Sequence, residues 1–96
     1  MPEEPREDAT LVLQTVKVNG NGALISAYSD HLSIVQSDGT RDIPIHAIAR
    51  VSHRTGMRTR LNLFLQSGEE LVIRGLKAKD VQRAYWIIVQ LASKAR

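Results

Sequence analysis

The sequence predicts a mainly β domain that is closed by one C-terminal α-helix. Residues 77–94 gather apolar side chains on one face at about 100° per residue, which is typical of an amphipathic helix. Residues 11–74 instead form short β-rich runs separated by turn residues such as Asn-Gly and Asp-Gly. We therefore expect a single domain over residues 11–96, built of about seven antiparallel strands and a terminal helix.

Charge is unevenly distributed along the chain. Residues 1–10 hold four acids, two prolines and almost nothing apolar, so we expect a disordered acidic tail there. The chain carries +3 overall and its first ten residues carry −3, which leaves +6 for residues 11–96. This excess permits contact with phosphates or an anionic membrane, and it equally serves solubility.

The turns divide the β-rich region into seven expected strands. These cover residues 11–18, 23–28, 31–36, 40–43, 47–54, 59–65 and 69–74. Pro44 cannot donate a backbone hydrogen bond, so we place it at a strand end or on an edge strand. Residues 19–22 (Asn-Gly-Asn-Gly) and 37–39 (Ser-Asp-Gly) are the clearest turns.

The last two hairpins can be placed in register, because residues that lie opposite each other share a face of the sheet. Ala49 and Val51 point inward with the leucines of residues 61–65, and the loops are residues 55–59 and 66–68. This register places Val51 opposite Leu63 and Leu63 opposite Leu71. It also predicts three outward rows: Arg54–Arg60–Arg74, Ser52–Asn62–Val72 and Arg50–Phe64–Glu70.

The row of three arginines indicates an anionic partner, because like charges placed opposite each other destabilise a sheet. The candidate anion-binding residues are Arg54, Arg58, Arg60 and Arg74. In the alternative interpretation the arginines extend into water or stack on neighbours, as Arg50 would on Phe64.

Trp86 lies about 160° from the centre of the apolar helix face. Either a loop or the N-terminal segment covers it, or it contacts another protein or subunit. Ile87 and Val89 widen the apolar surface and favour the interface. The candidate interface residues are Trp86, Phe64, Val72 and Arg50.

Residues for catalysis are missing from the sequence. It has no cysteine, and His31, His46 and His53 lack metal-ligand spacing. Neither a nucleophile motif nor a phosphate-binding glycine loop is present. We therefore predict no catalytic residue, no metal and no cofactor. Nucleic acid is not an expected partner, because exposed aromatic side chains are too few to form a stacking platform.

Core positions carry a family resemblance. Gly22-Ala23-Leu24, Leu32-Ser33-Ile34, Ile43-Pro44-Ile45, Ile48 and Val51 resemble the "Gly-x-Leu … Ile-Pro-Leu-x-x-Ile-x-x-Val" pattern of small bacterial pleckstrin-homology-like (PH-like) domains, with Ile45 at the Leu position. The resemblance covers residues 11–95. It implies a partly closed antiparallel barrel or sandwich of about seven strands, capped by the helix. Phosphoinositide-binding members use several basic residues around the loop between the first two strands, where this chain offers only Lys17.

Two functions follow as expectations. The first is a non-enzymatic interaction module that docks on a protein partner or forms a homo-oligomer. The alternative is peripheral binding to an anionic membrane lipid or a phosphate-bearing ligand through the arginine row. Because no secretory signal or membrane-spanning run is visible, we expect a cytoplasmic protein that could associate peripherally with the membrane.

Overall fold

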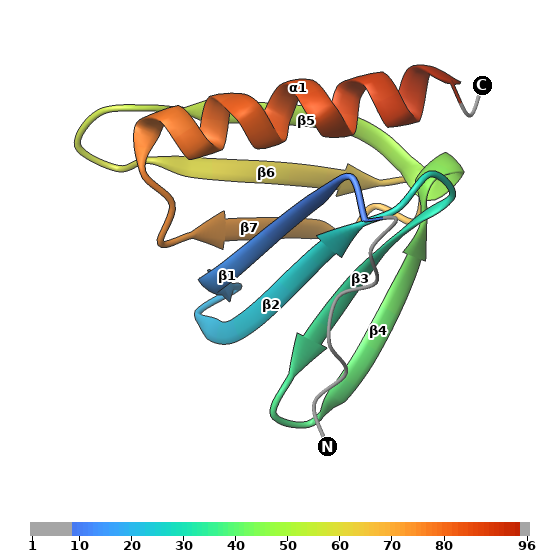
Figure 1. The fold of residues 1–96 in the computed structure, drawn as a ribbon, viewed down its shortest axis with the longest axis horizontal. Helices are drawn as coiled ribbons and strands as arrows, with labels where there is room; N and C mark the ends of the chain where they lie inside the picture. Colours follow the sequence, from blue (N-terminus) through green and yellow to red (C-terminus); the bar gives the residue numbers. More distant parts are fainter. Residues whose placement is uncertain (1–8, 95–96) are drawn as a thin grey trace.

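Seven antiparallel strands form one bent, unclosed sheet, and a single C-terminal helix packs across it (Figure 1). The structure is a computed structural model and describes residues 9–94. Its elements are β1 (Leu11–Val18), β2 (Asn21–Ala27), β3 (His31–Gln36), β4 (Gly39–Pro44), the 3₁₀ turn η1 (Ile45–Ala47), β5 (Ile48–Arg54), β6 (Arg60–Leu65), β7 (Glu70–Arg74) and α1 (Ala78–Lys94). The predicted fold class, a PH-like sandwich capped by a helix, is confirmed.

The strand order across the sheet is β4-β3-β2-β1-β7-β6-β5. Every neighbouring pair is a hairpin except β1 and β7, which joins the first four strands to the last three. The edge strands β4 and β5 are adjacent in sequence but do not pair, so the sheet stays open between them. Pro44 ends the edge strand β4, as predicted from its missing N–H.

The junction between β1 and β7 is short and requires an irregular β1. The two strands pair only at Lys17↔Arg74 and Val18↔Ile73. Before these residues, the pairing of β1 with β2 shifts register between Leu13 and Val16, at a β-bulge that puts Thr15 at a φ of 59°. Gly75 follows β7 with a φ of +92°, and a Cβ there would lie 3.2 Å from the Thr15 backbone oxygen. Glycine therefore fits both the local conformation and the close approach.

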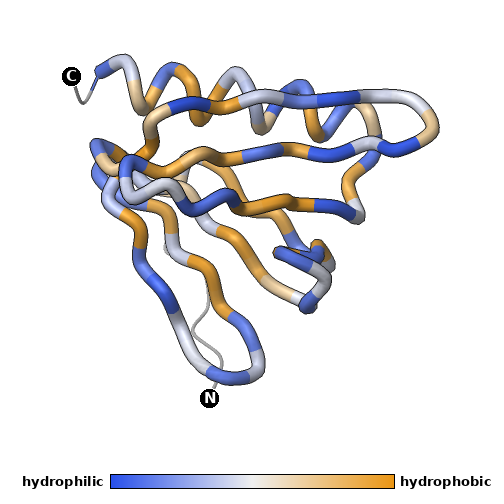
Figure 2. The backbone as a smooth tube through the Cα atoms, turned by 180° about the vertical axis from the view of Figure 1, so that it is seen from behind, coloured by the Kyte–Doolittle hydropathy of each residue, from blue (hydrophilic) through white to orange (hydrophobic). Residues whose placement is uncertain are grey.

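The core lies between the sheet and α1. Buried residues alternate with more exposed ones along β3 and β7, and Figure 2 shows the hydrophobic stretches of the strands. On the helix, Val81, Ala84, Ile88, Leu91 and Ala92 are buried. Among the strands, β5 makes the most extensive contact with α1. Within residues 9–94, no helix is long and apolar enough to cross a membrane.

The predicted register of the last two hairpins is confirmed. Val51 pairs with Leu63, Arg54 with Arg60, and Leu63 with Leu71. The predicted strand starting at residue 47 was wrong by one residue, because residues 45–47 form the 3₁₀ turn η1. Turn 19–22 is also narrower than predicted: Asn19 and Gly20 both have positive φ, as in a type I′ turn, so β2 already begins at residue 21.

Ala49 lies at a β-bulge that the sequence did not predict, and its side chain is half-buried. A register shift between Ile48 and Arg50 makes Ala49 an extra residue in a β-bulge. Ile48, opposite Leu65, takes the buried core position. Arg50 and the residues that follow it keep the predicted faces, because the bulge lies before them.

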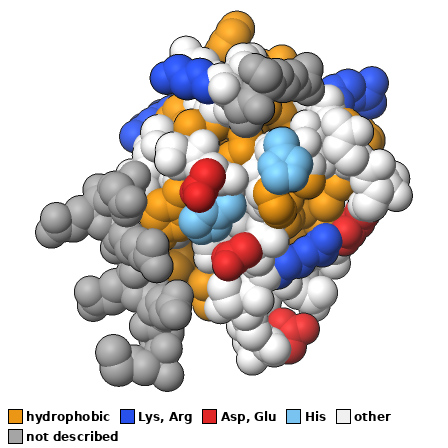
Figure 3. All heavy atoms as spheres, turned by 90° about the vertical axis from the view of Figure 1, so that its right-hand side faces the viewer, with side chains coloured by type: hydrophobic (Ala, Val, Ile, Leu, Met, Phe, Trp, Pro, Cys, Tyr) orange, Lys and Arg blue, Asp and Glu red, His pale blue; other side chains and the backbone are white. Residues whose placement is uncertain are grey.

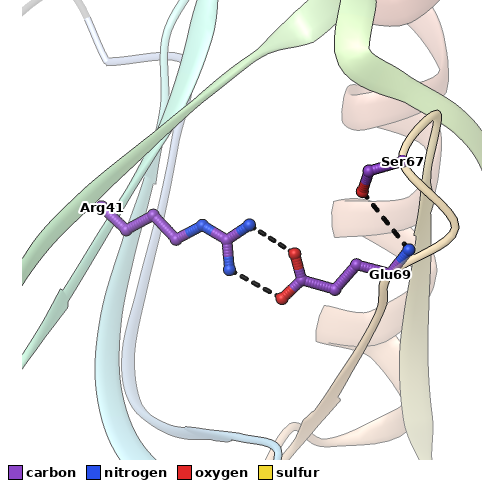
Figure 4. Close-up of polar contacts among 3 residues, drawn as sticks. All are labelled: Arg41, Ser67 and Glu69. Atoms are coloured by element: carbon purple, nitrogen blue, oxygen red, sulfur yellow. Dashed lines mark hydrogen bonds and ion pairs between the residues drawn. The ribbon is translucent and has the colours of Figure 1, made fainter.

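An ion pair links the edge strand β4 to the β6–β7 loop (Figure 4). Arg41 on β4 donates to both carboxylate oxygens of Glu69, in the β6–β7 loop, with Nη1–Oε2 at 2.7 Å and Nη2–Oε1 at 2.5 Å. The Ser67 hydroxyl accepts a hydrogen bond of 3.4 Å from the Glu69 N–H. Hydrogen bonding to Arg41 lowers the pKa of Glu69 and raises that of Arg41. The pair thus links residues 28 positions apart where no strands pair.

The close approach at Gly75 predicts that Gly75→Ala destabilises the fold by about 1–3 kcal/mol, since both a positive φ and a backbone contact oppose a Cβ. Gly20→Ala is the matched control for strain alone, because Gly20 has a φ of +89° in open space. Urea unfolding monitored by circular dichroism measures the difference. Equal losses in the two variants would show that the contact with Thr15 contributes nothing.

The Arg41–Glu69 pair predicts a pH-dependent contribution. Because the pKa of Glu69 is lowered in the folded state, the pair stabilises the fold above the ordinary carboxyl pKa of 4.5 and loses this effect as pH falls through the folded pKa. Glu69→Gln should cost about 0.2–1 kcal/mol at pH 7, since both side chains are partly exposed. The cost should disappear near pH 3, and Arg41→Gln should add nothing to Glu69→Gln. Urea unfolding of the two single variants and the double variant at pH 7 and pH 3 measures these differences in unfolding free energy. A destabilisation that is as large at pH 3 as at pH 7 would contradict this account.

Candidate interaction surfaces

Basic side chains form a continuous row across four strands. Arg54 pairs with Arg60 across β5 and β6, and Arg74 pairs with Lys17 across β7 and β1. The pairing of β6 with β7 ends at Leu61↔Ile73. Arg60 and Arg74 are the residues next to this pair on their own strands. We call Arg54, Arg60, Arg74 and Lys17 the basic row. The sequence predicted its three arginines, and the β1–β7 junction adds Lys17.

The basic row has no recorded carboxylate partner within the described chain. Within residues 9–94, the close contacts between carboxylates and basic side chains are Asp30 with His31 and Arg41 with Glu69. The opposite end of the molecule differs in character, since Figure 3 shows acidic side chains beside two histidines there. In that region His31 Nδ1 lies 2.6 Å from Asp30 Oδ1, and its ring stacks on Tyr28 at 4.7 Å. The unpaired cations therefore mark the end that holds the β5–β6 hairpin.

The β5–β6 loop, residues 55–59, is an ordered projection from this basic end. The Thr59 hydroxyl donates to the Gly56 carbonyl at 3.1 Å, and Gly56 has a φ of +113°. Met57 has a relative exposure of 103%, so its side chain makes no covering contact. Arg54, Thr55, Met57 and Arg58 line an open hollow of about 450 Å³. Arg58 therefore lies beside Met57 at the tip, close to the basic row.

Trp86 is the largest exposed apolar side chain of the described residues, with 61% of its surface accessible. Its ring meets Tyr85 edge-on at 5.5 Å, and Tyr85 contacts the His53 ring at 4.4 Å. The order His53, Tyr85, Trp86 leads from the β5 end of the hairpin onto α1. No loop within residues 9–94 covers Trp86. The N-terminal segment, which was the other predicted cover, lies mostly outside the described residues.

Phe64, Val72 and Arg50 lie on a different surface from Trp86. They point away from the core on the outer face of the sheet, whereas Trp86 lies on the side of α1 that faces away from the core. Arg50 stacks 4.4 Å above the Phe64 ring, as the alternative interpretation of the arginines predicted. Phe64 and Val72 are half-buried. The four candidate interface residues therefore do not form one continuous patch.

The outer face is also more enclosed than its sequence pattern predicted. Asn62 is only 7% exposed and donates its amide hydrogen bond to Glu70. The Asn19 side chain accepts a 2.9 Å hydrogen bond from the Val72 N–H. These polar contacts tie three strands together and leave little apolar surface between them.

Sequence reasoning missed two features of these surfaces. Met57 was placed in a loop but its full exposure was not predicted, although a lone apolar residue beside an arginine in a short loop is a signal that the sequence contains. The contact between His53 and Tyr85 depends on how α1 crosses β5, and no local pattern encodes it. Among residues 9–94, no cluster of three or more His, Asp or Glu side chains could hold a metal ion.

Comparison with solved structures supports the fold. A chain in a structure described as the Spt16D Pob3N heterodimer matches with a TM-score of 0.73 and 10% sequence identity. The match covers 86% of this chain and 50% of that chain, so the described domain corresponds to about half of its neighbour. No protein-family model matches the sequence. No curated protein matches it either. At this identity the likeness shows a shared PH-like fold.

Proposed function

We propose that the protein is a non-enzymatic module that binds another protein, or a second copy of itself, through the outer face of α1. This outer helix face consists of Gln82, Arg83, Trp86 and Gln90, which are all exposed and recur at helical spacing. The observation that carries the proposal is the 61% exposure of Trp86. Tryptophan is enriched among the residues that dominate binding energy at protein interfaces.

The position of Trp86 supports binding in a second way. Its edge-on contact with Tyr85, which in turn contacts His53, restricts the ring on a rigid helix. A side chain that is already held loses less conformational entropy when a partner covers it. Polar neighbours at positions 82, 83 and 90 supply the rim that surrounds the apolar centre of a typical interface.

The structural neighbour gives independent support at the level of the fold. Its description names a heterodimer, so a chain that contains this fold takes part in a protein–protein assembly. The identity of the partner does not carry over at 10% sequence identity.

A second candidate function is binding of an anionic ligand at the basic row. The supporting observation is that Arg54 lies directly opposite Arg60, in an arrangement that costs stability unless an anion neutralises it. Neither side chain forms an ion pair within residues 9–94. Binding of this kind weakens steeply as salt concentration rises.

Replacing Trp86 tests the first proposal. Trp86→Ala should weaken self-association or partner binding at least tenfold while the monomer stays folded, because the exposed ring contributes little to the core. The measurement is molar mass by light scattering behind a sizing column, over a range of concentrations, with pull-down from a lysate of the source cells. Val12→Ala is the matched control, because Val12 is an apolar residue on β1 that is 37% exposed and lies away from α1's outer face. A Trp86 variant with unchanged mass and unchanged partner recovery would contradict the proposal.

A further inference from the structure

We infer that the tip of the β5–β6 hairpin docks the protein on an anionic lipid bilayer, with Met57 inserted among the headgroups and the arginines on lipid phosphates. The inference rests on the second candidate function and specifies both its ligand and an apolar anchor. The parts involved are the loop of residues 55–59, which contains Met57 and Arg58, and the basic row, which begins at Arg54 beside the loop.

Met57 is the first element of the argument. Its relative exposure of 103% means that the fold gains nothing from its apolar surface. Methionine is flexible and polarisable, so it adapts to irregular apolar surroundings such as the boundary between headgroups and acyl chains. A single apolar side chain gives only weak insertion by itself, and stable membrane attachment needs a second, electrostatic signal.

The basic side chains supply this second signal. Arg54 and Arg58 line the same open hollow as Met57. Arg60, Arg74 and Lys17 continue the positive charge along the sheet. Cations near an anionic membrane surface are attracted within about one Debye length, and their contributions accumulate. Guanidinium groups also donate pairs of hydrogen bonds to phosphate oxygens.

The shape of the hairpin allows such an approach. Figure 1 shows the loop projecting beyond the start of α1, so the tip can meet a flat surface before the helix does. The Thr59–Gly56 hydrogen bond fixes the loop, which limits the entropy lost on docking.

A bilayer explains this combination of features better than other anions. A soluble phosphate or a nucleic acid backbone would pair with the arginines but leave Met57 in water. An acidic protein would need its own pocket for a side chain that projects at the extremity of a loop. A bilayer presents phosphates and an apolar layer together, at successive depths.

The test compares full-length variants for binding to phosphatidylcholine vesicles with and without phosphatidylserine, by co-sedimentation over a salt series. We expect binding only to the vesicles with phosphatidylserine, weakened by salt and lost in Arg60→Glu. Met57→Ser should lower the affinity roughly fivefold to tenfold, whereas Met57→Leu should retain it. Met57 is fully exposed, so these variants should fold normally. Lys94→Glu is the charge-matched control, because Lys94 lies in the last turn of α1, away from the hairpin.

Three results would overturn the inference. If Met57→Ser binds vesicles as tightly as wild type while Arg60→Glu does not bind, the insertion is wrong but the anion-binding function stands. If wild type binds neither vesicles nor soluble polyphosphate, both the membrane docking and the anion-binding function are wrong. If polyphosphate or a DNA duplex binds as tightly as the vesicles and Met57→Ser leaves this binding unchanged, the ligand is a soluble polyanion.

Discussion

The two-residue junction between β1 and β7 determines the rest of this structure. Without the pairs Lys17↔Arg74 and Val18↔Ile73, the first four strands and the last three would be separate sheets. β1 has a β-bulge at Thr15 before it reaches β7, and the chain leaves β7 beside that bulge at Gly75, where a Cβ would be strained. From there α1 returns across β5 and β6 and completes the core. The Arg41–Glu69 pair then links the edge strand β4 to the β6–β7 loop.

Most local structure could be predicted from the sequence, because hairpin turns and alternating burial specify pairing over short distances. The register from β5 to β7 follows from the leucines of β6 and the two loop lengths, and the structure shows the same residue pairs. Pairing of β1 with β7 could not be predicted, since nothing local links residues more than 50 positions apart. The bulge at Ala49 was missed because inserting one residue changes no hydrophobic pattern that a short window can detect.

The candidate surfaces were only partly predictable for the same reason. Arg54 and Arg60 follow from one hairpin, whereas Lys17 joins them through the distant junction. Phe64 and Val72 alternate correctly onto the outer face, yet side chains from neighbouring strands enclose them. The exposed fraction of a side chain depends on what packs over it, whereas alternation in the sequence predicts only the face of the sheet on which the side chain lies.

Exposed apolar groups and unpaired cations mark the surfaces that the fold leaves unused. Trp86 and Met57 contribute little to the core, and Arg54 opposite Arg60 opposes folding unless an anion is present. The fluorescence of Trp86, the only tryptophan, tests this account most directly. In dilute protein we predict a water-exposed emission spectrum and ready quenching by acrylamide, with shielding when a partner binds. A blue-shifted emission that resists quenching in the dilute monomer would show Trp86 already covered and would contradict the account.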